Sequence, residues 1–245
     1  MSRLTIAIPT FRRPEDLKRA VGGVLEQASE LAAGPTAEAS GPRTDAEAGT
    51  EGDATDAKGG AGEDVSDIEV LVIDNDAQGS GHEAAFAAAA DVGVPVRSSE
   101  EAPVESGGVS VRYVVEERPG VAAVRNRALD ETAERDLLIF IDDDEDPEPG
   151  WLAALVGLWA STGCQAVAGP VIPVYEVEPE EWVRQGEFFV RRTWPTGTVR
   201  PVAASNCLLL DLGFVRRAGL RFDEAFGATG GEDTLFTRRL SAAGG

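Results

Sequence analysis

Residues 137–147 read LLIFIDDDEDP, an apolar run that ends abruptly in a cluster of carboxylates. An unbroken run of β-forming apolar residues is typical of a strand that is buried on both faces, as in a parallel sheet. Open α/β sheets bind their ligands at the edge where such strands end. Neighbouring carboxylates repel one another there, and a divalent cation would offset that repulsion because hard cations prefer oxygen ligands.

Three interpretations of this acidic cluster compete. A run of Asp and Glu is ordinarily a solvated loop. Asp142, Asp144 and Asp146 also match alternate ligand positions of an EF-hand calcium loop. However, Pro147 stands where that loop needs Gly and Ala153 where it needs Glu, so we discard it. The third interpretation is a Mg²⁺ or Mn²⁺ site that holds a phosphate-bearing substrate.

Composition narrows the class of protein. The chain has 245 residues, 42% of them hydrophobic, which is enough for one large α/β domain or two small ones. A formal net charge of −21 argues against nucleic acids and anionic membrane surfaces as partners. No apolar run approaches the ~20 residues of a membrane span, and residues 1–3 lead straight into a strand, so we expect no secretory signal. Cys164 and Cys207 fit reduced core thiols of a cytoplasmic protein, and the single histidine, His82, fits a surface loop.

Alternating strand and helix patterns organise the chain. A strand at 4–9 is followed by a helix that opens at Pro14, and the turn between them, residues 10–13, lacks the glycines of a dinucleotide fold or P-loop. Further strands are expected at 68–75, 111–115, 137–141, 165–171 and 206–210, and further helices at 83–90, at 121–129, from 149, and at 233–241. This order predicts a single α/β domain, a mostly parallel Rossmann-like sheet with right-handed crossovers and helices on both faces.

Two segments interrupt this pattern. Residues 28–66 consist of small, polar and acidic residues with almost no large apolar side chain. Such a segment cannot bury enough surface to offset its ordering entropy, so we predict a disordered acidic insertion in a loop. A second, milder insertion is expected at 95–108. Part of the net charge belongs to these segments, and it therefore says less about the folded surface.

Five motifs in order resemble family 2 glycosyltransferases with the GT-A fold. They are IPTFRRP at 8–14, VIDND at 72–76, GVAAVRN at 120–126, FIDDD at 140–144 and GGEDTLF at 230–236. The third resembles the "G-x-A-x-A-R-N" helix, the fourth the "D-x-D" metal motif and the fifth the "G-G-E-D" start of the catalytic helix. Each motif alone is weak, but five in the same order across nearly the whole chain form a specific signal.

The resemblance implies an inverting transferase that uses a nucleotide sugar, usually a UDP-sugar. It implies a Mn²⁺ or Mg²⁺ cofactor at Asp142 and Asp144, and it makes Asp233 the general base with Glu232 as its neighbour or stand-in. Glu145 and Asp146 become solvated neighbours of the metal site. The nucleotide-binding residues that it implies are Pro9, Thr10, Phe11, Arg13, Asp74, Asn75, Arg125 and Asp143. An ordinary acid at a helix N-terminus remains the alternative for Asp233.

The acceptor is expected to be a glycan, polysaccharide or lipid-linked precursor, bound by the variable region 175–198. Peripheral association with the inner face of the membrane is an open alternative to a freely cytoplasmic protein. Family members generally continue past the catalytic helix, often with a metal-binding His, whereas this sequence stops at 242–245. We therefore expect a C-terminally truncated GT-A domain over 1–245. A non-catalytic nucleotide-sugar-binding remnant and, less favoured, a nucleotidyltransferase stay as alternatives.

Overall fold

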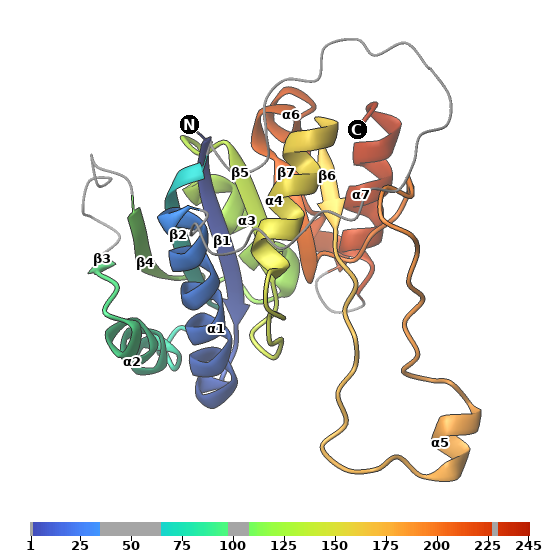
Figure 1. Cartoon of the computed structure of the whole chain (residues 1–245), viewed down its shortest axis with the longest axis horizontal. Coiled ribbons are helices and arrows are strands. Elements are labelled where there is room, and N and C mark those ends of the chain that lie inside the picture. Colours follow the sequence, from blue (N-terminus) through green and yellow to red (C-terminus); the bar gives the residue numbers. More distant parts are fainter. Residues whose placement is uncertain (1, 35–64, 98–107, 227–229) are drawn as a thin grey trace, which may run out of the picture.

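A seven-stranded sheet with the order β3-β4-β2-β1-β5-β7-β6 forms the centre of the protein (Figure 1). This computed structural model describes residues 2–34, 65–97, 108–226 and 230–245. The strands are β1 (Ser2–Thr10), β2 (Val65–Asp74), β3 (Val96–Arg97), β4 (Gly108–Val115), β5 (Leu137–Ile141), β6 (Ala166–Ala168) and β7 (Cys207–Asp211). The helices are α1 (Pro14–Ala33), α2 (His82–Val92), α3 (Val121–Glu131), α4 (Trp151–Thr162), α5 (Glu181–Gln185), α6 (Leu212–Arg217), the 3-10 helix η1 (Glu224–Phe226) and α7 (Glu232–Ala242).

The sheet is mostly parallel, as the alternation of strands and helices predicts. β1 pairs in parallel with β2 on one side and with β5 on the other, and β4 continues the parallel set. β7 runs antiparallel to both β5 and β6, so among the described strands it is the one that runs toward the edge where β1 begins. The carboxyl ends of β1, β2 and β5 therefore lie at one edge, as expected for a ligand site of an α/β sheet.

Helices cover both faces of the sheet, which confirms the expected α/β architecture. α1, α2 and α4 bury their apolar sides on one face, while α3, α6 and α7 pack on the other. The sheet needs cover on both faces because its strands are apolar on both sides. In β5, for example, all five side chains are buried, and they alternate between the two cores. Burial of a leucine or isoleucine stabilises the fold by about 1.5–3 kcal/mol, and this central strand contributes on both faces.

Several boundaries differ from the sequence prediction. α1 continues to Ala33 because Gln27 and Ala28 are still buried against the core, so the insertion begins later than residue 28. β2 already starts at Val65, so the first insertion ends before residue 66. Val96–Arg97 pairs with β4, and β4 starts at Gly108, so the second insertion is shorter than the predicted 95–108. The rest of the two predicted insertions, residues 35–64 and 98–107, lies outside the described residues.

Three smaller predictions were wrong. The strand expected at 165–171 is confined to Ala166–Ala168, and the helix expected from Pro149 begins at Trp151. His82 starts α2 instead of lying in a loop, with its ring stacked on Phe86. These short-range errors leave the sheet and its functional edge as predicted.

The two cysteines are free thiols, but only one belongs to the core. Cys207 is buried at the start of β7 and accepts a hydrogen bond from Trp151 Nε1 at 3.2 Å. A Cβ atom on Gly169 would lie 2.4 Å from Cys207 Sγ, so this close approach of β6 and β7 needs a glycine. Cys164 is partly exposed. Within the described ranges, no helix is both long and apolar enough to cross a bilayer.

Candidate active site

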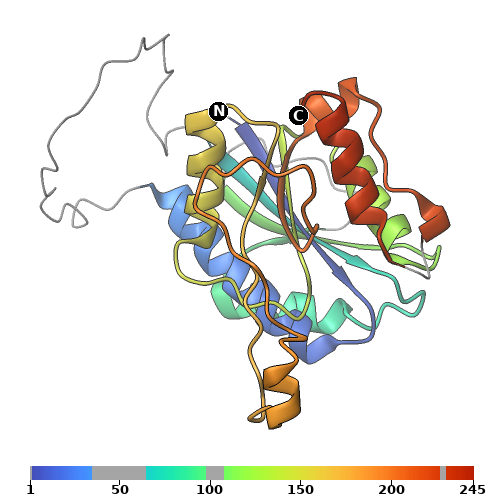
Figure 2. The same ribbon diagram turned by 90° about the vertical axis from the view of Figure 1, so that its right-hand side faces the viewer.

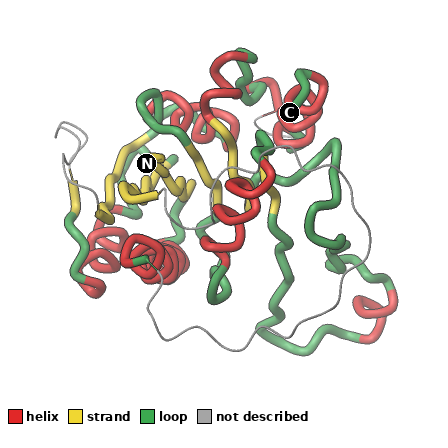
Figure 3. The backbone as a smooth tube through the Cα atoms, turned by 45° about the horizontal axis from the view of Figure 1, so that its top comes forward, coloured by secondary structure: helices red, strands yellow, loops and turns green. Residues whose placement is uncertain are grey.

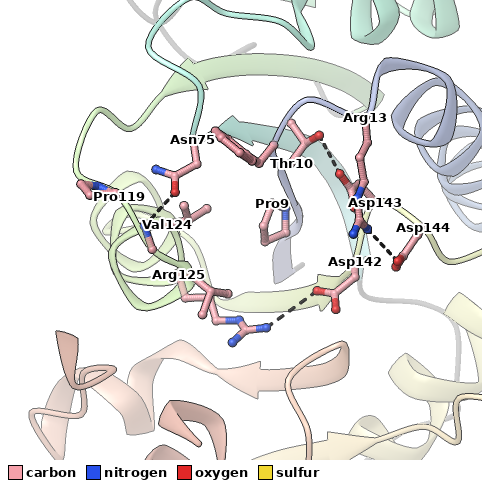
Figure 4. Close-up of a pocket in the computed structure, with 13 residues that line it drawn as sticks. Pro9, Thr10, Arg13, Asn75, Pro119, Val124, Arg125, Asp142, Asp143 and Asp144 are labelled. Carbon is pink, nitrogen blue, oxygen red and sulfur yellow. Dashed lines mark hydrogen bonds and ion pairs between the residues drawn. The ribbon is translucent and has the colours of Figure 1, made fainter. Parts of the chain in front are cut away.

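A cavity of about 630 Å³ opens at the edge where β1, β2 and β5 end (Figure 4). The strand register brings its walls together, because Thr10 lies beside Asp74 and Ala7 beside Phe140. The lining residues are Pro9, Thr10, Phe11, Arg13, Asn75, Pro119, Gly120, Val121, Val124, Arg125, Asp142, Asp143 and Asp144. Four of the five sequence motifs thus meet at one cavity.

The turn after β1 supplies one wall of the cavity. Arg12 turns the chain in a left-handed conformation with φ 57°, and its guanidinium is held by Asp76 with Nε 3.1 Å from Oδ2. This turn leaves Phe11 52% exposed in the cavity lining. It also points Arg13 toward the acidic loop (Figure 4). An exposed aromatic ring beside an arginine is a surface on which a flat, negatively charged ligand can bind.

The buried Asp143 anchors the acidic loop to β1. Thr10 Oγ1 donates a hydrogen bond to Asp143 Oδ2 at 2.7 Å, and Arg13 Nη1 lies 3.4 Å from Oδ1. Burial raises the pKa of Asp143, and the contacts with Thr10 and Arg13 act against that rise. Arg13 Nη1 also lies 2.7 Å from Asp144 Oδ2, and Asp144 stays about half exposed. The Asp143 carboxylate is thus held by Thr10 and Arg13 although it lines the cavity, whereas the Asp144 side chain is more exposed.

Asp142 faces the cavity from the opposite side of the loop. Its Oδ1 lies 3.8 Å from Nη2 of Arg125, which points toward it from α3 (Figure 4). Burial raises the pKa of Asp142, and the charges of Asp143 and Asp144 add to the rise while Arg125 opposes it. The cluster thus concentrates negative charge with one nearby arginine on each side, Arg13 and Arg125.

Arg125 is also paired with Glu232, a contact that no local pattern of residues predicts. Arg125 Nη1 donates to Glu232 Oε1 across 107 residues, and both side chains are almost completely buried, at 7% and 6% exposed. Arg125 Nε and Glu232 Oε2 have no hydrogen-bond partner among the described residues. The pair ties the start of α7 to the acidic loop.

Glu232 and Asp233 lie in the first turn of α7 and outside the cavity lining. The preceding Gly231 has φ 98°, a conformation that strains any residue with a side chain. Asp233 is half-buried, and its Oδ1 accepts a hydrogen bond from the Thr234 amide at 2.5 Å. The two acids thus differ, since Glu232 is buried in an ion pair and Asp233 is in part accessible.

The side chains of Asn75 and Asp74 form hydrogen bonds within the protein. Asn75 Nδ2 donates to the carbonyls of Glu116 and Arg118 at 2.7 Å each, and its Oδ1 accepts from the Gly120 amide at 2.9 Å. Asn75 therefore holds the loop that starts α3, although it lines the cavity. Asp74 is completely buried and lies outside the lining.

The Asp74 carboxylate accepts three hydrogen bonds, from the Asp76 amide at 2.8 Å, the Gly81 amide at 2.7 Å and the Tyr113 hydroxyl at 2.6 Å. Burial and this carboxylate raise the pKa of Tyr113. Asp74 thus holds the turn after β2 without lining the cavity.

Glu145 is not the solvated neighbour that the sequence suggested. Asn206, just before β7, donates Nδ2 to Glu145 Oε1 at 2.5 Å, which links the acidic loop to the antiparallel strand. Burial, together with the charge of Asp142, raises the pKa of Glu145 to about 7. Asp146 is exposed, as expected, and pairs with Arg19 at 2.6 Å.

Comparisons with known proteins match this chain to one protein family. The model of the family described as Glycosyl transferase family 2 matches residues 61–211. The succinoglycan biosynthesis protein ExoM of Rhizobium meliloti (strain 1021) is 33% identical over 184 residues, which cover 73% of this chain and 52% of ExoM. The chain thus spans about half the length of that curated relative.

Two solved structures share the fold at low identity. The mannosyltransferase PcManGT from Pyrobaculum calidifontis, in complex with GDP-Man and Mn2+, is 16% identical with a TM-score of 0.55, over 99% of this chain and 52% of that one. S. aureus TarS 1-349 in complex with UDP is 13% identical with a TM-score of 0.56, over 96% of this chain and 54% of that one. At such identities the likeness establishes the fold.

Proposed function

Because this chain belongs to glycosyl transferase family 2, we propose that it transfers a sugar from a nucleotide sugar, best fitted by a UDP-sugar, to a hydroxyl group of an acceptor. The observation that carries the proposal is the cavity, where the turn after β1, the start of α3 and the acidic loop converge. Its aromatic, basic and acidic parts correspond to the base, diphosphate and cation of such a donor. Reaction with inversion at the anomeric carbon is part of the proposal.

The donor would lie between the turn after β1 and the start of α3. Phe11 offers a ring on which the base can stack, with Pro9 and Thr10 beside the ribose. Asn75 and the 116–120 loop that it fixes shape the far wall. Gly120 and Val121 line the cavity at the N-terminus of α3, where the helix dipole favours the diphosphate. Asp74 would act indirectly, through the turn that it holds.

The donor atoms of the acidic loop suit a hard divalent cation. Asp142 and Asp144 both line the cavity, and within the described ranges no cluster of three or more His, Cys, Asp or Glu could hold a metal by itself. Two carboxylates completed by phosphate oxygens and water are a usual arrangement for Mg²⁺, so Mn²⁺ or Mg²⁺ fits. When bound, the cation would neutralise charge on the diphosphate leaving group.

Asp233 is the proposed general base. A sugar hydroxyl is a weak nucleophile, so a carboxylate must take its proton while the new bond to the anomeric carbon forms and the bond to the diphosphate oxygen breaks. Glu232 is less suited, since one of its oxygens is committed to Arg125. In this proposal Arg125 holds α7 against the acidic loop, and its contact with the diphosphate is secondary. A single displacement turns an α-linked donor into a β-linked product.

The acceptor, in this proposal, is a glycan, a polysaccharide or a lipid-linked precursor. The chain between β6 and β7 begins and ends at the edge that carries the cavity, because Cys207 pairs with Ile141 at the end of β5. This chain segment contains the region 175–198 that the sequence suggested for the acceptor. The similarity to ExoM, a succinoglycan biosynthesis protein, supports a polysaccharide product.

Calorimetry with UDP tests the proposal. UDP should bind in the presence of Mn²⁺ or Mg²⁺, and Asp144→Ala should lose that cation-dependent binding. Asp146→Ala is the matched control, because Asp146 lies in the same loop, is exposed and is not part of the cavity lining. Lack of UDP affinity with any divalent ion would overturn the proposal. Nucleotide-sugar binding without turnover would reduce it to the non-catalytic alternative.

A further inference from the structure

Residues 172–200 leave the body of the protein as an arm between β6 and β7 (Figures 1 and 2). Both views show α5 at the far end of the arm, beyond the end of the sheet where β1 finishes. Apart from α5 the arm is loop (Figure 3). None of its residues is buried. The arm therefore projects from the edge that carries the cavity.

The arm exposes many large apolar side chains. They are Ile172, Val174, Tyr175, Val177, Trp182, Phe188, Phe189, Val190, Trp194 and Val199. Two aromatic pairs link different parts of the arm, Trp182 with Phe188 and Tyr175 with Phe189, with ring centroids 5.9 and 6.2 Å apart. A concentration of exposed apolar surface of this kind marks an interaction site.

The second limb of the arm, residues 188–200, is also positively charged. It carries three arginines and no acidic residue, in a chain whose formal charge is −21. Arg191 and Arg192 form no ion pair with any residue that the structure describes, whereas Arg184 in α5 is paired with Glu178 and Glu181. Arg200 lies over the Trp194 ring, 4.1 Å from its centroid. Positive charge and exposed aromatic rings thus occur together on one limb.

We propose that the second limb docks on the surface of an anionic phospholipid bilayer. Guanidinium groups bind phosphate well, and tryptophan favours the boundary between headgroups and acyl chains. The formal charge of the whole chain, −21, argued against binding to such a surface. Charges beyond about 8 Å are largely screened at physiological ionic strength, so the charge that meets the bilayer is that of the second limb itself. The rest of the arm, residues 172–187, carries five glutamates and one arginine, so this docking needs the second limb to face the bilayer and the first limb to face away. Docking in this way would turn the cavity edge toward the bilayer.

This inference goes beyond sugar transfer, and its test does not depend on enzymatic activity. Vesicles of phosphatidylcholine alone, or of phosphatidylcholine mixed with phosphatidylglycerol, test it by co-sedimentation with the 245-residue chain. The chain should bind the mixed vesicles and not the neutral ones, with binding weakened by salt. Each arginine near an anionic surface contributes about fivefold in affinity, so Arg191→Gln with Arg192→Gln should lose about 25-fold. Trp194→Ala should also weaken binding.

Arg217→Gln is the matched control for the single variant Arg192→Gln. Arg217 is exposed on α6, which follows the far end of β7, so the same loss of charge should leave vesicle binding unchanged. Circular dichroism should show all variants folded, because the arm contributes no buried residue. Three results would overturn the inference: no binding to the mixed vesicles, equal binding to neutral ones, or wild-type binding by the double variant. Self-association abolished by Trp194→Ala would assign the arm to a second copy instead.

Discussion

Removal of Arg125 should destabilise the fold, because Glu232 would stay buried without a counter-charge. The two side chains are only 7% and 6% exposed. Breaking a buried pair by removing one partner typically costs about 3–5 kcal/mol of unfolding free energy. Arg125→Met is the suitable change, since its unbranched side chain can keep the packing near the Phe222 ring, 5.8 Å from the guanidinium carbon. We expect a loss of about 3 kcal/mol, at the lower end of that range.

A double-mutant cycle separates the pair from general damage to the core. Glu232→Leu alone should also cost about 3 kcal/mol, because it leaves the Arg125 guanidinium buried. The double variant should cost much less than either single change, and far less than their sum of about 6 kcal/mol, since two apolar side chains can replace a buried ion pair at little cost. Asp142 also loses its arginine in this variant, but its side chain is 37% exposed and solvent limits that loss.

Urea unfolding followed by circular dichroism measures these values by linear extrapolation. Arg221→Met serves as the matched control, because the pair of Arg221 with Asp130 is about half exposed on both sides. Exposed pairs contribute about 0–1 kcal/mol, so this variant should unfold almost like the wild type. If Arg125→Met cost no more than Arg221→Met, or if the two single effects simply added, the role given to the buried pair would be wrong.

Three further predictions concern the cavity and a second ion-pair network. Phe11→Ala should weaken UDP binding by about 1–3 kcal/mol through the loss of base stacking, and unchanged affinity in calorimetry would refute a stacking role. Thr10→Val should lower the unfolding free energy by about 1.5–3 kcal/mol, since Asp143 loses its 2.7 Å hydrogen bond; a loss within error in urea titrations would show that other partners suffice. Glu131, at the end of α3, pairs with Arg112 and Arg127. Burial acts to raise the pKa of Glu131, but the hydrogen bonds and charges of these two arginines outweigh it and lower the pKa. Stability from a lowered carboxyl pKa is complete above the unfolded value of about 4.3 and is lost as the pH falls through the folded value, so Glu131→Gln should cost most near neutral pH and less in acid. A cost independent of pH would contradict this sign.

Local patterns in the sequence were enough to predict the sheet and the edge at which the cavity opens. The apolar run at 137–141 and the strand at 4–9 have the lengths and compositions of buried strands, and Pro14 marks the start of α1. Parallel strands end at the same edge by topology, so the polar residues that follow them were expected to meet. The five motifs add the family, because their order along the chain does not depend on tertiary contacts.

Only the tertiary structure decided which polar side chains are occupied by contacts within the protein and which stay open to a ligand. The carboxylates of Asp74 and Asp144 look alike in the sequence, but Asp74 is completely buried under three hydrogen bonds while Asp144 is about half exposed. Glu232 finds Arg125 across 107 residues, and Asn206 reaches Glu145 because β7 runs back beside β5. Burial and charge pairing depend on neighbours that are distant in the chain, and no local pattern of residues records them.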